Sequence, residues 1–107
     1  MAEYSGEIHE YILNLPSPKY SGRSSITLIG GEFGRALITF LPEAEPLPDN
    51  HKSDPGPLFY IYYPRDYWAT IIDILRNEKP SYFRFTTPDC HAQISTRREP
   101  VGEEEAV

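Results

Sequence analysis

The sequence is poor in cysteine, in long hydrophobic runs and in positive charge. Cys90 is the single cysteine among 107 residues, which excludes an internal disulfide and is typical of a protein from a reducing compartment. The apolar runs are far shorter than the ~20 residues that a helix needs to cross a bilayer. The sequence does not open with the basic and apolar segments of a signal peptide. We therefore expect a cytoplasmic protein with no membrane contact.

The formal net charge is -6, which argues against a polyanion such as nucleic acid as the obvious partner. The charge is uneven, because Glu99, Glu103, Glu104 and Glu105 lie in residues 99–107. Without them the rest of the chain is nearly neutral. A chain of this length can bury one core without metal or disulfide. We therefore predict one domain over residues 1–98 and an acidic, flexible tail over residues 99–107.

What the sequence does contain is apolar alternation with a period of two, which is typical of strands with one buried and one open face. From Tyr82 to Phe85, for instance, phenylalanine alternates with tyrosine or arginine. On this pattern we predict strands over residues 7–15, 20–29, 33–41, 58–63, 81–86 and 91–98. Gly30 and Gly31 predict a hairpin turn after the second strand, because paired glycines supply the positive φ of tight turns.

Two segments break the alternation. Residues 42–57 carry five prolines and no periodicity, so we expect a long loop without a regular element. Residues 65–77 place apolar side chains at helical spacing, which predicts one amphipathic helix packed through Trp68, Ile72 and Leu75. The order of elements is then β-β-β-β-α-β-β. We predict an α+β fold with a single antiparallel sheet of about six strands and the helix packed on one face.

Such a sheet has one face toward the helix and one face away from it. The aliphatic and phenylalanine positions form the inner face: Ile26, Leu28, Ala36, Ile38, Phe40, Phe59, Ile61, Phe83, Phe85, Ala92 and Ile94. The polar and tyrosine positions form the outer face. Its candidate binding residues are Arg23, Arg35, Tyr60, Tyr62, Tyr82, Arg84, Gln93 and Arg97, accompanied by Thr27, Thr39 and Ser95.

The sequence offers little chemistry for catalysis or for a metal ion. Cys90 and His91 are adjacent, so their side chains point to opposite sides of an extended chain and poorly fit a nucleophile–base pair. His9, His51 and His91 are scattered without the spacing of metal ligands. We therefore predict no catalytic residue, no metal and no cofactor, and we interpret His51 as a solvated side chain of the loop.

An outer face of interleaved arginine and tyrosine fits three interpretations. It can be a protein interface, a solvated sheet surface, or a platform where single-stranded nucleic acid stacks on tyrosine and contacts arginine. In the order of its elements alone, four strands followed by a helix, the chain is similar to small single-strand-binding coactivators and plant Whirly proteins. The net acidity favours the protein interface. We predict a non-enzymatic interaction domain that contacts another protein or forms a homodimer, with single-stranded nucleic-acid binding as the alternative.

Overall fold

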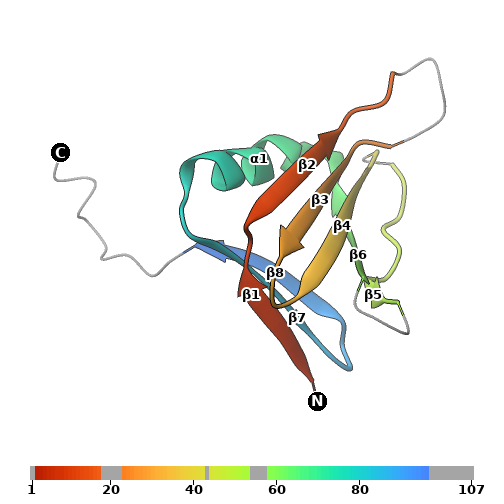
Figure 1. The fold of residues 1–107 in the computed structure, drawn as a ribbon. Helices are drawn as coiled ribbons and strands as arrows, with labels where there is room; N and C mark the ends of the chain where they lie inside the picture. The colour runs from red at the N-terminus through yellow and green to blue at the C-terminus, as the bar shows by residue number, and fades with distance from the viewer. Residues whose placement is uncertain (1, 18–22, 43, 54–57, 97–107) are drawn as a thin grey trace, which may run out of the picture.

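The strands lie in two sheets, so the prediction of one sheet of about six strands is wrong, whereas the α+β class is confirmed. The computed structural model (Figure 1) describes residues 2–17, 23–42, 44–53 and 58–96. The 3-stranded sheet has the order β1-β7-β8, with β1 (Glu3–Glu7), β7 (Ser81–Thr86) and β8 (His91–Thr96). The 5-stranded sheet has the order β2-β3-β4-β6-β5, with β2 (Glu10–Asn14), β3 (Ser25–Gly30), β4 (Gly34–Leu41), β6 (Leu58–Pro64) and β5 (His51–Lys52). The predicted acidic tail lies outside the described residues.

The first predicted strand is divided between the two sheets at Ile8 and His9. The Ile8 N–H donates to the Ser81 carbonyl oxygen at 2.9 Å, and the His9 N–H donates to the Ile29 carbonyl oxygen at 2.8 Å. The register places Glu10 opposite the same Ile29. Two consecutive residues therefore face one, which is the arrangement of a β-bulge, and a bulge bends the strand that carries it. The bend lets one continuous segment supply an edge strand to each sheet.

The five-stranded sheet is mixed, because β4 and β6 run parallel. We expected a purely antiparallel sheet from the adjacent hairpins, and this expectation is wrong for the pair of β4 and β6. A parallel pair needs a connection of a dozen or more residues, and residues 42–57 provide it. Part of this connection is regular, contrary to the prediction: His51 and Lys52 form β5, which pairs antiparallel with β6.

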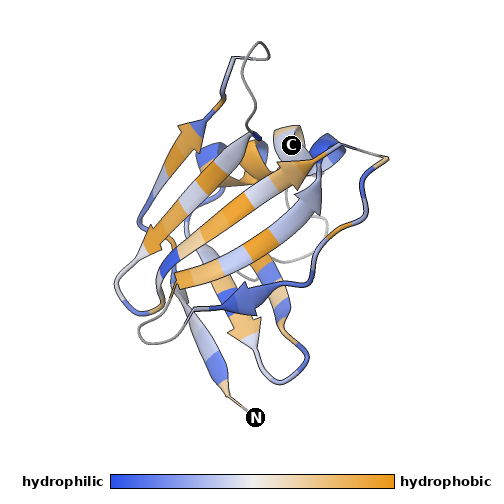
Figure 2. Cartoon of the chain, turned by 90° about the vertical axis from the view of Figure 1, so that its right-hand side faces the viewer, coloured by the Kyte–Doolittle hydropathy of each residue, from blue (hydrophilic) through white to orange (hydrophobic). Residues whose placement is uncertain are grey.

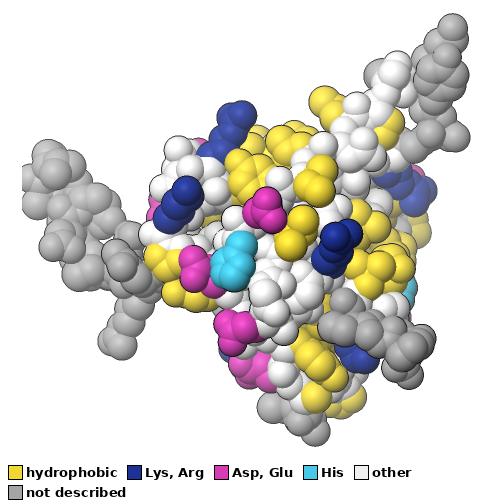
Figure 3. Space-filling model, in the orientation of Figure 1, with side chains coloured by type: hydrophobic (Ala, Val, Ile, Leu, Met, Phe, Trp, Pro, Cys, Tyr) yellow, Lys and Arg dark blue, Asp and Glu magenta, His cyan; other side chains and the backbone are white. Residues whose placement is uncertain are grey.

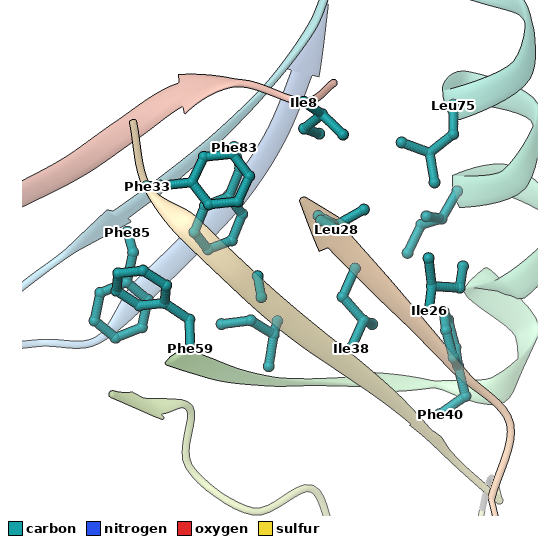
Figure 4. Close-up of a cluster of buried hydrophobic side chains, with 13 residues drawn as sticks. Ile8, Ile26, Leu28, Phe33, Ile38, Phe40, Phe59, Leu75, Phe83 and Phe85 are labelled. Atoms are coloured by element: carbon teal, nitrogen blue, oxygen red, sulfur yellow. The ribbon is translucent and has the colours of Figure 1, made fainter. Parts of the chain in front are cut away.

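The core lies between the two sheets at one end and between the five-stranded sheet and the helix at the other (Figure 4). Between the sheets, Phe59 of β6 contacts Phe83 and Phe85 of β7, with ring centroids 5.4 Å and 4.9 Å apart. The ring centroids of Phe33 and Phe83 are 4.9 Å apart. The predicted inner face is confirmed in its burial: Ile26, Leu28, Ala36, Ile38, Phe40, Phe59, Ile61, Phe83 and Phe85 are buried, and Ala92 and Ile94 are partly buried.

The predicted helix is present, although its first turn is a 3-10 turn, η1 (Arg65–Tyr67), followed by α1 (Trp68–Asn77). Ile71 and Leu75 are its buried residues, and the Trp68 ring meets the Phe40 ring edge-on at 5.0 Å. The helix runs beside β2 on the inner side of the five-stranded sheet (Figure 1). None of the helices in the described segments has the length and apolar character needed to span a membrane.

The hairpin between β3 and β4 is confirmed, but its glycines act differently from the prediction. The positive φ, 89°, belongs to Gly34 at the start of β4. Gly30 is required for close approach instead, because a Cβ there would lie 2.2 Å from the Phe33 ring. The turn therefore depends on packing as much as on backbone conformation.

Candidate functional site

The five-stranded sheet has one face that no described helix or strand covers, and Figure 2 looks onto it. We call this surface the open face. The cross-strand register arranges its side chains in three rows. These rows are Glu10–Ile29–Arg35–Leu58, Ile12–Thr27–Leu37–Tyr60–His51 and Asn14–Ser25–Thr39–Tyr62.

Only part of the predicted binding set lies on the open face. The structure brings together Arg35, Tyr60 and Tyr62, with Thr27 and Thr39 between them. The residues Tyr82, Arg84, Gln93 and Ser95 lie on the outer side of the three-stranded sheet, because their neighbours Phe83, Phe85, Ala92 and Ile94 turn inward toward the core. Since the two sheets enclose that core between them, these two groups point away from each other. The single continuous face of the prediction is therefore wrong.

Two candidate residues, Arg23 and Arg97, remain. Arg23 precedes β3 and forms a salt bridge with Glu45, a residue of the connection between β4 and β5. Arg97 lies outside the described residues. A binding role for any member of the predicted set stays a prediction.

An aromatic stack on the open face was missed by the sequence analysis. The His51 ring lies 4.7 Å from the Tyr60 ring at an interplanar angle of 17°, and 6.1 Å from the Tyr62 ring at 26°. His51 is exposed, as expected, but it stands over the tyrosines instead of in a free loop. A two-residue strand carries no periodicity, so no signal in the sequence pointed to this placement.

Aliphatic side chains complete the open face. Ile29, Leu37 and Leu58 are partly buried, and Ile12 is 55% exposed. Together with the stacked rings they make a mixed apolar and aromatic surface. Polar and charged side chains lie among them in the same rows: Glu10, Asn14, Ser25, Thr27, Arg35 and Thr39.

Positive charge is dispersed over the described surface. Arg84 lies 3.3 Å from Glu3 on the far side of the molecule, and Arg23 is paired with Glu45, which leaves Arg35 as the arginine of the open face. Figure 3 shows one side of the molecule, on which Lys and Arg side chains lie singly among acidic ones. This arrangement is unlike the continuous basic groove that tracks a nucleic-acid backbone.

The candidate chemical groups do not converge in the described segments. Cys90 lies in the β7–β8 turn with φ 55°, and its Sγ is 3.7 Å from the Pro88 carbonyl oxygen. The described residues hold no group of three or more His, Cys, Asp or Glu side chains able to bind one metal ion.

Burial, with a smaller effect of the neighbouring Tyr67, raises the pKa of Tyr63 above its usual value of 10.0.

One polar side chain beside the open face has a structural role. Asn50 accepts a hydrogen bond from the Tyr62 N–H at 3.0 Å and donates one to the Cys90 carbonyl oxygen at 3.2 Å. It thereby joins the segment before β5 to β6 and to the β7–β8 turn. The hydrogen bonds hold His51 in place, because His51 is the next residue in the chain.

Comparisons of the chain with models of protein families, with curated proteins and with solved structures find no match.

Proposed function

We propose that the chain is a non-enzymatic interaction domain that associates with a second copy of itself through the five-stranded sheet. The observation that carries this proposal is the five-stranded sheet itself: no described helix or strand lies over its open face, which bears aliphatic and aromatic side chains among polar ones, and its outermost strand, β2, exposes Ile12 and Leu13. Burial of exposed apolar side chains such as these removes apolar area from water, which is the main favourable contribution to most protein–protein association.

Single-stranded nucleic-acid binding is the second candidate, and the stacked His51, Tyr60 and Tyr62 rings are what favours it. Bases stack readily on such rings. Two observations weigh against it. Arg35 and Arg84 lie on opposite sides of the molecule, and Arg23 and Arg84 are already paired with carboxylates. A cytoplasmic location also remains a prediction from the sequence.

The test is the mass of the protein in solution over a range of concentrations, by sedimentation velocity. We expect reversible conversion from monomer to dimer at micromolar concentration. The apolar contacts should make this association insensitive to salt, whereas contacts between charges weaken as ionic strength rises. A monomer at every concentration would contradict the proposal.

A further inference from the structure

Each sheet has two edge strands, and three of the four edges are poor sites for pairing with another strand. β5 has only two residues. β1 carries Glu3 and Glu7, and β8 is polar except for two inward-facing residues, Ala92 and Ile94. Short edge strands and charged edge strands are common protections against pairing with another chain.

The fourth edge, β2, is longer than β5 and carries one charged residue, Glu10, at its first position; it differs from the other edges in the large aliphatic side chains that it exposes. Its sequence is Glu-Tyr-Ile-Leu-Asn, with neither lysine nor proline. Ile12 is 55% exposed, Leu13 is 40% exposed, and Leu15 just after the strand is 71% exposed. Among the described residues β2 pairs with β3 alone, and Figure 2 shows it as an outermost strand of the sheet.

We propose that two copies of the chain pair through their β2 strands, antiparallel about a two-fold axis at Ile12. The proposal rests on the self-association proposed above and names the surface that carries it. In this arrangement the two five-stranded sheets join into one continuous sheet. Ile12 then lies opposite Ile12 of the other copy, because it is the middle residue of the strand.

The strand is complementary to itself in this register. Glu10 of one copy lies opposite Asn14 of the other, so a carboxylate faces an amide and the two Glu10 residues stay apart. Tyr11 lies opposite Leu13, which pairs an aromatic ring with an aliphatic side chain. A register shifted by two residues in one direction would instead place Glu10 opposite Ile12, and a shift in the other direction would place Ile12 opposite Asn14. The charge pattern therefore favours a second copy in the centred register.

The surroundings of β2 extend the contact beyond the strand. The middle row of the open face begins at Ile12, so pairing makes this row continuous across both copies. On the inner side, Leu15, Trp68 and Ala69 line a pocket of about 280 Å³ beside the same edge. Stable protein interfaces bury about 1,200–2,000 Å² in total, more than a five-residue strand pair provides, and this pocket offers further apolar surface.

The experiment uses Ile12→Lys and Ile12→Glu, separately and mixed, with sedimentation velocity as the readout. Ile12 is more than half exposed, so a charged side chain fits there in the monomer. Each variant alone places two like charges opposite each other, and we expect its dimer dissociation constant to rise at least ~30-fold. An equimolar mixture of the two variants should recover a dimer, because lysine then faces glutamate. Thr39→Lys, in the same open face but on the central strand β4, is the matched control and should leave the dimer unchanged.

The outcomes separate the two proposals. A wild-type dimer that Ile12→Lys leaves intact, or that Thr39→Lys disrupts more than Ile12→Lys, overturns pairing through β2 while self-association stands. Loss of the dimer in both single variants without recovery in the mixture overturns the two-fold position of residue 12. A wild-type monomer at every concentration overturns both proposals. Circular dichroism and thermal melting of each variant confirm that the compared proteins are folded.

Discussion

Gly30 occupies a position at which no side chain fits. A Cβ built there would lie 2.2 Å from Cε2 of Phe33 and 2.6 Å from the Glu7 carbonyl oxygen. Phe33 is buried against Phe83, so it has little room to move away. We expect Gly30→Ala to lower the free energy of unfolding by ~2 kcal/mol, within the usual range for overpacked sites. Denaturation with urea measures the change.

Gly31→Ala is the matched control, one residue further along the same turn. Its Cβ would meet only the His9 ring, at 3.5 Å, which is an ordinary contact distance. We expect the free energy of unfolding of this variant to stay within ~0.5 kcal/mol of the wild type. Equal losses of unfolding free energy in the two variants would mean that the backbone freedom of glycine, and not steric crowding by Phe33 and Glu7, explains the need for Gly30.

Tyr63, a partly buried residue near the end of β6, makes the stability of the fold depend on pH. Burial first, and the charge of Tyr67 second, raise the pKa of its hydroxyl in the folded chain above 10.0. A group with a raised folded pKa contributes stability that is complete below its unfolded pKa and is lost as pH rises through the folded value. We therefore expect the free energy of unfolding to fall above pH 10 more steeply in the wild type than in Tyr63→Phe. Parallel curves for the two proteins would contradict this contribution.

Hydrogen bonds hold the residues on both sides of β5, and the side-chain bonds of Asn50 hold the segment before it. Asn50 accepts from the Tyr62 N–H and donates to the Cys90 carbonyl oxygen, while the Ser53 N–H donates to the Leu58 carbonyl oxygen at 2.8 Å. We expect Asn50→Ala to lower the free energy of unfolding by ~1–3 kcal/mol, because it leaves both backbone groups without that partner. Amide exchange at Tyr62 should accelerate with it.

Asn50→Asp refines this prediction, because aspartate keeps the acceptor for Tyr62 and loses the donor to Cys90. Exchange at Tyr62 should then stay close to the wild-type rate although stability falls. Rapid exchange at Tyr62 in the wild-type protein would show that β5 and its flanking residues do not hold the edge of β6.

Alternation predicted the elements whose side chains have two distinct environments. From Ile26 to Leu28, and again from Phe83 to Phe85, buried and open positions follow strictly, and the strands and core residues were predicted there. The break at Ile8 has a faint signature, since the inward phase passes from Tyr4 and Ile8 to Tyr11. The partner of each strand has no comparable signature, so the parallel β4–β6 pair could not be predicted.

The same reasoning explains the partial success at the candidate site. Tyr60 and Tyr62 were placed on an outer face correctly, because Phe59 and Ile61 occupy the buried phase between them. Whether they share that face with Arg84 depends on how many sheets the strands form. The alternation of buried and open residues has a period of two in either case, so it cannot distinguish one sheet from two. The division at Ile8 and His9 therefore decided the make-up of the site.

At the scale of the whole molecule, the separation of the arginines leads to a prediction about nucleic acid. Arg35 and Arg84 lie on opposite sides, so one strand of nucleic acid cannot contact both through a short segment. We expect single-stranded oligonucleotides to bind negligibly at physiological salt. A titration monitored by fluorescence anisotropy at two salt concentrations measures this. Tight binding with a steep salt dependence would instead support the nucleic-acid alternative.

The ribosome delivers a chain N-terminus first, so β1 is made long before its partner β7. Just beyond the paired residues of the two strands, the Thr87 N–H donates to the Ala2 carbonyl oxygen, 85 residues away in the sequence. Contacts between such distant segments form late, because closing a long loop costs entropy. Until the β7–β8 hairpin emerges, Phe33 and Phe59 have no sheet to cover them. The nascent chain thus presents aromatic side chains of the kind that chaperones shield, and its last third completes the fold.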